Sequence, residues 1–404
     1  MKRVLVLLLC ATAALGQQNT RGGAAGTGSY AVQPLRTEPK IVWEARPGFR
    51  DFGAMVVSGD TVVTGNTTGT GGTFAFSATT GKKLWSLPNQ MWGEPAVDSK
   101  AAYVVNRDPT TDARLSSVDL KTGKILWVVK DDGLGEDESA PVLMGGRLYI
   151  VNRRGTVRSY EAASGKPIWS FTYSGGKSNC PTGAVVANGL VYFGGTDEVG
   201  NKGPFLWAVD AATGKQAWRY KAGVETSSNG ECVSPAALAN GEVVFTAKRV
   251  LYALDAQSGN LLWKKQGTRT VKGEQKPEDL SEPIIANGIV YAFMQDGLTG
   301  WELKSGKSVF DLPGKFTVDA GVNRMAAAGG VLYVLANLPG NDGANAPYRP
   351  LNAVDVASGK VLWTHRVNRP SAPNLDTNQW RILFVLPAEG ALYYENKSIL
   401  VKLQ

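Results

Sequence analysis

Acidic, basic and aromatic side chains occur together at positions that could bind a cofactor or a metal ion. These positions are Trp92, Glu94, Glu138, Glu282, Arg324, Trp380 and Arg381. Carboxylate oxygens of Glu94, Glu138 and Glu282 are the kind of ligand that Ca²⁺ prefers. The planar arginine fork binds carboxylates, and tryptophan offers a large apolar face. The set could hold an anionic or carbohydrate-like ligand beside Ca²⁺, but mutual ion pairs around a water-filled channel are the interpretation we favour.

Two cysteines occupy matching positions in neighbouring parts of the chain. Cys180 and Cys232 each precede the Asn of an Asn-Gly pair, at Asn188 and Asn240, by the same number of residues. In an oxidising compartment, two cysteines in equivalent places of adjacent units can form a disulfide. The alternative is two separate buried thiols, because distant backbones cannot be bridged. We predict the disulfide.

The elements that must position these residues form an internal repeat. Strings such as "VDLKTGKILW", "VDAATGKQAW" and "VDVASGKVLW" return at intervals of about 45 residues, a spacing typical of repeat architectures. The copies end on Trp85, Trp127, Trp169, Trp218, Trp263, Phe310 and Trp363, and Trp43 stands in a final strand alone. Regular spacing favours a packing role for these aromatics over ligand stacking.

Each copy contains the signals for four antiparallel strands. An Asn-Gly turn joins the first two strands in "AVVANGLVYFG", because these residues accept the positive φ of a tight hairpin. A third strand, a Thr/Ser-Gly-Lys turn and a fourth strand ending in the aromatic follow. The chain ends after three strands, and residues 40–45 supply the missing fourth. We therefore predict an all-β fold, an eight-bladed β-propeller of four-stranded antiparallel blades closed by the N-terminal strand.

The turn lysines and the single histidine are expected to be exposed. A lysine follows the turn glycine at Lys82, Lys124, Lys166, Lys215, Lys307 and Lys360. These lysines should form a solvated ring on one face of the propeller. His365 lies on an outer strand, where we expect it at the surface, and one histidine cannot build a zinc site.

The N-terminus predicts export. Residues 1–16 combine Lys2 and Arg3 with an apolar run and a small-residue cleavage site, which indicates a signal peptide. Cys10 lies inside the apolar run and is read as part of that peptide. Residues 17–39 are rich in Gly, Gln and Thr and predict a flexible tether, followed by the propeller over residues 40–404. We expect a periplasmic or secreted protein, without a transmembrane segment.

The charge of the chain gives no support to nucleic-acid binding. The formal net charge is +8, but no block of five or six like basic residues occurs. We therefore expect no nucleic-acid partner and a monomer.

Blades that end in Asp-x-x-Thr/Ser-Gly-Lys-x-x-Trp resemble the pyrroloquinoline quinone (PQQ) type of propeller repeat, over residues 40–404. The resemblance implies one of two functions. Quinoprotein dehydrogenases bind PQQ and Ca²⁺ above the propeller axis and oxidise alcohols or sugars, whereas other members are non-catalytic periplasmic propellers, such as the lipoprotein of the outer-membrane assembly machinery. This chain lacks the adjacent cysteine pair of the quinoprotein alcohol dehydrogenases and the Cys-x-x-Cys-His of haem c. Cys10 is a poor acceptor for the lipid of the assembly lipoprotein. No catalytic residue is carried over from either branch.

Strand order places the short turns on one face and the long, varied loops on the other, where function is expected. We predict a binding or scaffolding protein that engages a protein partner of the cell envelope through the long-loop face, with no cofactor. The alternative is a small quinoprotein oxidoreductase that binds PQQ and Ca²⁺ at the mouth on that face. Its cofactor-binding residues would be Trp92, Glu94, Glu282, Arg324, Trp380 and Arg381, and its metal ligands Glu94, Glu138 and Glu282.

Overall fold

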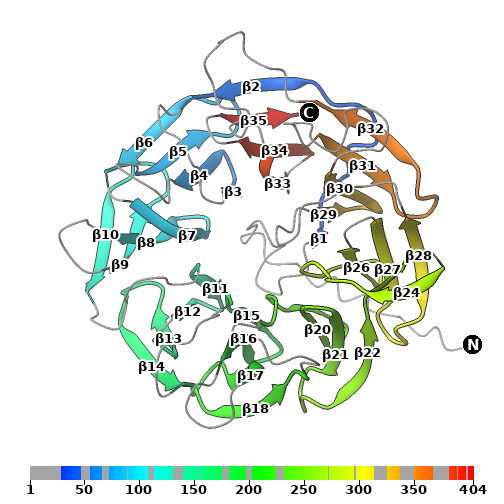
Figure 1. Ribbon diagram of the computed structural model, residues 1–404. Helices are drawn as coiled ribbons and strands as arrows, with labels where there is room; N and C mark the ends of the chain where they lie inside the picture. Colours follow the sequence, from blue (N-terminus) through cyan, green and yellow to red (C-terminus); the bar gives the residue numbers. More distant parts are fainter. Residues whose placement is uncertain are drawn as a thin grey trace, which may run out of the picture.

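Eight four-stranded antiparallel sheets surround a common axis in the computed structural model (Figure 1). The structure describes residues 29–46, 55–65, 72–88, 90–107, 113–130, 140–152, 154–174, 182–196, 203–223, 232–271, 273–294, 297–313, 325–336, 350–366, 382–388, 390–396 and 399–404. Within these ranges every regular element is a strand, and no helix is long and apolar enough to span a membrane. The predicted fold class is confirmed.

The blades follow one another around the ring, each with its first strand nearest the axis. Blades one and two contain β3 (Val56–Ser58), β4 (Thr61–Gly65), β5 (Thr73–Ser77) and β6 (Lys83–Leu87), then β7 (Gln90–Val97), β8 (Ala101–Arg107), β9 (Ala113–Asp119) and β10 (Ile125–Lys130). Blades three and four contain β11 (Val142–Met144), β12 (Arg147–Val151), β13 (Thr156–Glu161) and β14 (Pro167–Thr172), then β15 (Val185–Ala187), β16 (Leu190–Thr196), β17 (Pro204–Asp210) and β18 (Gln216–Lys221). Blades five and six contain β19 (Ala237–Ala239), β20 (Glu242–Ala247), β21 (Val250–Asp255) and β22 (Leu261–Gln266), then β25 (Ile284–Ala286), β26 (Ile289–Met294), β27 (Gly297–Glu302) and β28 (Ser308–Pro313). Blades seven and eight contain β29 (Met325–Ala328), β30 (Val331–Leu335), β31 (Leu351–Asp355) and β32 (Val361–His365), then β33 (Ile382–Ala388), β34 (Ala391–Asn396), β35 (Leu400–Leu403) and β2 (Ile41–Ala45).

The two ends of the chain close the ring in blade eight, as predicted. β2 pairs antiparallel with β35, and the peptide groups of Lys40 and Gln404 exchange two hydrogen bonds of 2.9 and 3.0 Å. Closure in this way pairs the edge that β35 would otherwise expose.

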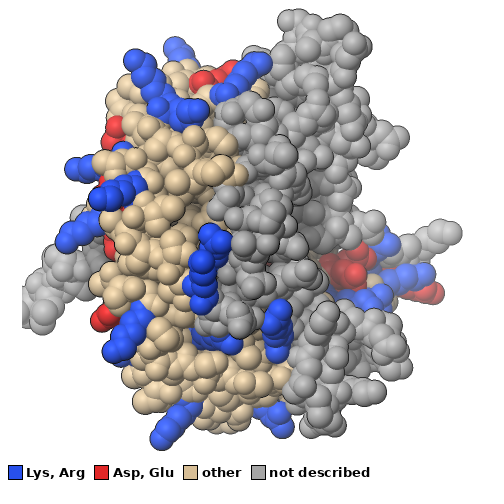
Figure 2. Space-filling view, turned by 90° about the vertical axis from the view of Figure 1, so that its left-hand side faces the viewer, with Lys and Arg blue, Asp and Glu red and all other residues tan. Residues whose placement is uncertain are grey.

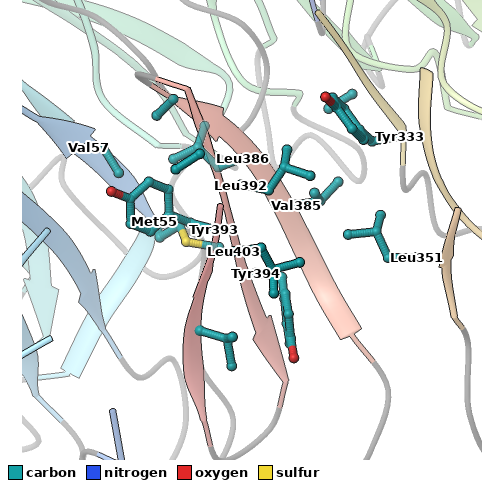
Figure 3. Packing of buried hydrophobic residues seen from close by; sticks show 14 of the residues in the cluster. Met55, Val57, Tyr333, Leu351, Val385, Leu386, Leu392, Tyr393, Tyr394 and Leu403 are labelled. Atoms are coloured by element: carbon teal, nitrogen blue, oxygen red, sulfur yellow. The ribbon is translucent and has the colours of Figure 1, made fainter. Parts of the chain in front are cut away.

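A hydrophobic cluster spans the closure. Figure 3 shows side chains of blade eight, including Leu386 and Leu392, between Met55 of blade one and Leu351 of blade seven. All four of these side chains are fully or almost fully buried. Burial of this apolar surface on both sides stabilises the last blade within the ring.

The Asn-Gly turns have the backbone that the sequence predicts. Asn188 and Gly189 have φ of 53° and 78°, and Asn240 and Gly241 have φ of 52° and 80°. Positive φ at both central residues is the type I′ hairpin geometry, whose twist matches that of the flanking strands.

The repeated tryptophans pack between blades, which confirms their structural role. Seven indole Nε1–H groups each donate to a backbone carbonyl outside their own blade. The acceptors are Ala78 for Trp43, Leu120 for Trp85, Ala162 for Trp127, Ala211 for Trp169, Ala256 for Trp218, Leu303 for Trp263 and Leu35 for Trp363. The turn glycine of the following blade packs directly against most of these indole rings. At Gly214, a β-carbon would come within 2.6 Å of Trp169, so the position requires glycine for space as well as for its φ of 72°.

The junction between blades six and seven lacks this hydrogen bond, because Phe310 stands where the other blades carry tryptophan. The buried Tyr291 hydroxyl at the same junction has no hydrogen-bond partner among the described residues. Its counterparts Tyr149 and Tyr192 donate to Ala211 and Ala256.

We therefore expect Phe310→Trp to stabilise the protein by about 1 kcal/mol, through a new indole N–H bond to the carbonyl of Val356. A β-carbon on Gly359 would lie 3.0 Å from Leu312 and 3.7 Å from Phe310, so the Phe310 ring lies farther from its turn glycine than Trp169 does from Gly214. The reverse change, Trp263→Phe, should destabilise by a similar amount. Urea unfolding of both variants measures the two effects, and a destabilised Phe310→Trp protein would show that the site is already filled.

Residues 29–39, within the segment for which a flexible tether was expected, pack along blade seven. β1 (Ser29–Tyr30) pairs in parallel with β29, and Tyr30 is 4% exposed. The Leu35 N–H donates to the Tyr333 hydroxyl at 2.7 Å, and Arg36 forms an ion pair of 2.8 Å with Asp355. The physical reason is the way the ring closes. In the other blades the tryptophan donates to a carbonyl in the turn between the last two strands of the next blade, but β35 and β2 of blade eight are not joined by a turn. The carbonyl of Leu35 therefore accepts the hydrogen bond of Trp363. Residues 17–28 and the expected signal peptide lie outside the described residues.

His365 is buried, which corrects the expectation of a surface position. It is 8% exposed, and its Nε2 lies 3.2 Å from the Tyr394 hydroxyl of blade eight. Burial lowers its pKa, an effect that the nearby charge of Glu38 partly opposes. In each outer strand, the repeated aromatic residue that packs against the next blade is called here the docking aromatic. The second residue after it faces the neighbouring blade, so its side chain packs inward whatever its type. The turn lysines, in contrast, are exposed as predicted.

Candidate functional site at the mouth of the long-loop face

The first strand of blade two carries Trp92 and Glu94 to the long-loop end of the propeller. Both lie in β7, and Glu94 is half-buried. The pairing of β7 with β8 shifts between Trp92 and Ala96, and Gly93 within this bulge has a φ of 69°. A β-carbon on Gly93 would come within 2.9 Å of the backbone of Ala140, where blade three begins. The bulge thus allows blades two and three to approach closely, and it sets the direction of Glu94.

A second carboxyl group, Glu395, lies close enough to interact with Glu94. Glu395 belongs to β34 in blade eight and is fully buried. The Thr64 hydroxyl of blade one donates to its Oε1, whereas its Oε2 has no hydrogen-bond partner among the described residues. Burial raises the pKa of Glu395 well above its usual value, the Thr64 bond opposes the rise, and the charge of Glu94 adds to it. Burial in this site therefore favours the protonated form of Glu395.

Glu395 was missed by the sequence analysis, although the repeat contains a signal that identifies it. The residue two places after the tyrosine of the second strand is apolar or small in most blades. That position holds Gly65, Val105, Val151, Gly194, Thr246, Phe293, Leu335 and Glu395. Glu395 is the one charged residue at this position of the repeat, where packing between blades does not require a charge. Residues that break the packing pattern in this way often mark functional sites.

Hydroxyl side chains shape the mouth in blades four to six. Thr182, Ser234 and Ser281 each accept the N–H of a second-strand residue, at 2.6, 2.9 and 2.8 Å. The N–H of each returns a bond to the same strand. Ser281 also donates to the carbonyl of Glu282 at 3.1 Å, which fixes the backbone of that candidate residue. Each hydroxyl precedes the Asn of its Asn-Gly pair by the same interval, so the pattern is visible in the sequence.

The remaining predicted site residues divide into two groups. Glu282 is half-buried, and Cys232 is exposed and disulfide-bonded. Glu138, Cys180, Arg324, Trp380 and Arg381, together with the side chain of Trp92, lie outside the described residues. The pairing of Cys232 with Cys180 stays a prediction. In the described part of the chain, no three His, Cys, Asp or Glu side chains come together as a metal site would require.

The arrangement of Glu94 and Glu395 supports a pair of carboxyl groups that share a proton more directly than it supports a metal site. Two carboxyl groups that interact across the seam of blades eight, one and two resist simultaneous ionisation. In its protonated form Glu395 can donate a hydrogen bond through Oε2, which has no partner among the described residues, and the Glu94 carboxyl group can accept one. Such a pair could orient a polar group of a ligand or partner at the mouth.

Curated relatives fall into two groups. The chain is 27% identical over 243 residues to the outer membrane protein assembly factor BamB of Moranella endobia, covering 56% of this chain and 57% of the relative. It is 25% identical over 288 residues to the quinohemoprotein alcohol dehydrogenase ADH-IIG of Pseudomonas putida, covering 66% of this chain and 37% of the relative. The chain thus spans little more than half of the first relative and just over a third of the second.

Solved structures and a family model agree on the architecture. BamB from Moraxella catarrhalis superposes with a TM-score of 0.64 at 14% identity, covering 91% of this chain and 99% of that one, which shows a shared fold. The model of the family described as outer membrane protein assembly factor BamB matches residues 32–139 and 111–365. These two segments together take in most of the propeller, and the chain therefore belongs to that family of PQQ-type repeats.

Proposed function

We propose that this protein is an exported β-propeller of the cell envelope that binds a protein partner through its long-loop face. The observation that carries the proposal is the match of the BamB family model across residues 32–365. Four of the curated relatives are outer membrane protein assembly factors, which supports a partner in outer-membrane assembly.

A described element on the long-loop face supplies a plausible contact. The hairpin of β23 (Thr268–Val271) and β24 (Glu274–Pro277) joins the outer strand of blade five to the inner strand of blade six. Every residue of β24 is exposed. A two-stranded hairpin has two open edges, and an open edge can accept a strand from another protein.

The base of this hairpin is firmly attached to blade five. Gly267 N–H donates to the Arg249 carbonyl at 2.7 Å, and Glu278 N–H donates to the Gly267 carbonyl at 2.8 Å. Ion pairs join Arg249 to Asp279 at 3.0 Å and Arg269 to Glu278 at 2.9 Å. A hairpin held this way loses little further freedom when a partner binds, which favours affinity.

Site-specific photocrosslinking in the cells that make the protein tests the proposal. A benzophenone amino acid in place of the exposed Gln275 should crosslink to a component of the outer-membrane assembly machinery. The same group in place of Lys215, which is exposed on the short-turn face, serves as the matched control. Equal labelling from both positions, or labelling from Lys215 alone, would contradict binding through the long-loop face.

The oxidoreductase alternative is supported by the Glu94–Glu395 pair at the mouth and by the quinohemoprotein relative. In this second candidate function, PQQ and Ca²⁺ would bind at the mouth, with Glu94 and Glu282 among the ligands. Calorimetric titration of the purified protein with PQQ, with and without Ca²⁺, separates the candidates. Saturable one-to-one binding that Glu94→Gln weakens would support the oxidoreductase, and absence of binding in the presence of Ca²⁺ would contradict it.

A further inference from the structure

The outer strand of each blade is an unpaired edge, and the edge of blade two differs from the others. Outer strands end their sheets in the described topology, so their outward backbone groups are open to another strand. In β10, Ile125, Leu126 and Val128 are 48%, 52% and 41% exposed. Three exposed aliphatic side chains on one open edge form a surface that proteins usually avoid.

The repeat allows the same positions to be compared in all eight blades. The residue directly after the docking aromatic points to solvent or is half-buried in every outer strand. In seven strands it is polar or charged: Glu44, Ser86, Ser170, Arg219, Lys264, Asp311 and Thr364. In β10 it is Val128, and the strand carries no charge before Lys130. Among the eight outer strands, only β10 has an aliphatic residue at this position.

The edge is rigid as well as open. The Trp127 indole donates to the Ala162 carbonyl of blade three at 3.1 Å. A β-carbon on Gly165 of blade three would lie 2.7 Å from the Trp127 ring and 2.8 Å from Val129, so both side chains pack tightly inward. A strand already fixed in an extended conformation pays little entropy when it accepts another strand.

Basic side chains border this apolar edge at its Lys121 and Lys124 end, whereas Lys130 at the other end is followed in the sequence by Asp131 and Asp132. Lys121, Lys124 and Lys130 are exposed, Lys166 of the next blade follows Gly165, and Arg114 lies opposite Lys130 on β9. Asp119 is the acid at the base of the blade-two turn, and its carboxylate accepts bonds from the Thr122 N–H and hydroxyl. Figure 2 views the side of the ring where β6 and β10 lie, and blue basic side chains outnumber red acidic ones on its described surface.

We propose that β10 is a docking edge for an extended strand of a partner protein with aliphatic side chains in its centre and acidic side chains at the end that meets Lys121 and Lys124. This edge would be a second binding surface, in addition to the long-loop face. The inference rests on the proposed function only in assuming that the partner is a protein. Backbone hydrogen bonds along the edge supply affinity, and the aliphatic and acidic positions supply specificity. A second copy of this chain fits less well, because it would bring the same lysines to the edge in a chain of net charge +8.

A defined peptide tests the edge in the purified protein. The probe is fluorescein-labelled Glu-Val-Thr-Val-Thr-Val-Glu with a C-terminal amide, followed by fluorescence anisotropy. Leu126→Lys should weaken binding at least tenfold, whereas Leu262→Lys, which alters the equivalent exposed position of β22, should change it less than twofold. Val128→Ser copies the residue type of blades one and three and should also weaken binding several-fold with little risk to folding. The peptide with alternate N-methyl groups should not bind, and the peptide with lysines in place of both glutamates should bind at least tenfold more weakly.

Four outcomes would overturn the proposal. Equal effects of Leu126→Lys and Leu262→Lys, or undiminished binding of the N-methylated peptide, would show that β10 is not the docking edge. A wild-type dimer in sedimentation equilibrium that Leu126→Lys converts to monomer would assign the edge to a second copy. Failure of the peptide assay together with specific crosslinking from Gln275 would contradict the edge and leave the proposed function intact.

Discussion

Replacing Glu395 with glutamine should remove a loss of stability that the wild-type protein shows as the pH rises above about 4.5. Burial raises the pKa of Glu395 well above the value of 4.5 that a free glutamate has. The folded protein therefore keeps the proton at pH values where the unfolded chain releases it. The stabilising contribution is complete below about pH 4.5 and is lost as the pH rises toward the pKa of the folded state.

The expected size of the effect follows from linkage. Each pH unit in that window should lower the free energy of unfolding of the wild type by about 1.4 kcal/mol relative to Glu395→Gln. Glutamine keeps an oxygen for the Thr64 hydroxyl and removes only the titration. Urea unfolding at several pH values between 4.5 and 8 measures the difference in slope.

Two controls connect this effect to the structure of the site. Thr64→Val removes the hydroxyl that favours the ionised form, so it should raise the pKa of Glu395 further and extend the window, whereas Thr64→Ser should resemble the wild type. Glu94→Gln removes a nearby charge and should shorten the window. Parallel pH profiles for the wild type and Glu395→Gln would show that Glu395 is not held neutral in the folded protein.

Deleting residues 1–39 should destabilise the propeller by at least about 4 kcal/mol relative to deleting residues 1–28. The longer deletion removes the buried Tyr30, and loss of a large buried aromatic typically costs about 3 to 5 kcal/mol. It also leaves the Trp363 indole N–H without its carbonyl and removes the Leu35 bond to Tyr333, and each such hydrogen bond is worth about 1 kcal/mol. The shorter deletion keeps all of these contacts.

Both deletions preserve β2, which closes the ring. The comparison therefore measures the contribution of residues 29–39, the docking segment, separately from that of ring closure. Urea unfolding gives the energies, and far-ultraviolet circular dichroism confirms that both proteins retain strand structure. Tyr30→Ala in the full chain should reproduce most of the loss. Equal stability of the two truncated proteins would mean that residues 29–39 add nothing to blade seven.

Arg36 gives the docking segment a dependence on pH and salt. Its guanidinium and the Ser358 hydroxyl hold the pKa of Asp355 at about 2. Because the Arg36 side chain is 51% exposed, we expect only a small contribution, and raised salt should weaken it. The apolar contacts of Tyr30 and the hydrogen bonds of Leu35 should therefore dominate the effect of the deletion.

Local features of the chain were readable from the sequence because they depend on nearby residues. Asn188 and Gly189 require positive φ for a two-residue hairpin, and the lysines after the turn glycines must face solvent on one side of the ring. Closure by residues 40–45 was also predictable, since three strands at the C-terminus and one at the N-terminus complete a single blade. In each case the pattern repeats with the fold, and repetition converts weak local signals into a definite architecture.

The eight blades, their turns, their packing aromatics and the closure of the ring all follow from patterns in the amino-acid chain. The assembled propeller is needed to show that Glu395 is buried against Thr64, that His365 is buried against Tyr394, and that the Leu35 carbonyl accepts the Trp363 indole N–H. These facts depend on pairs of residues far apart along the chain, such as Thr64 and Glu395, separated by 331 positions. Burial and hydrogen bonding at such contacts arise when the blades assemble around the axis, and no local periodicity records them.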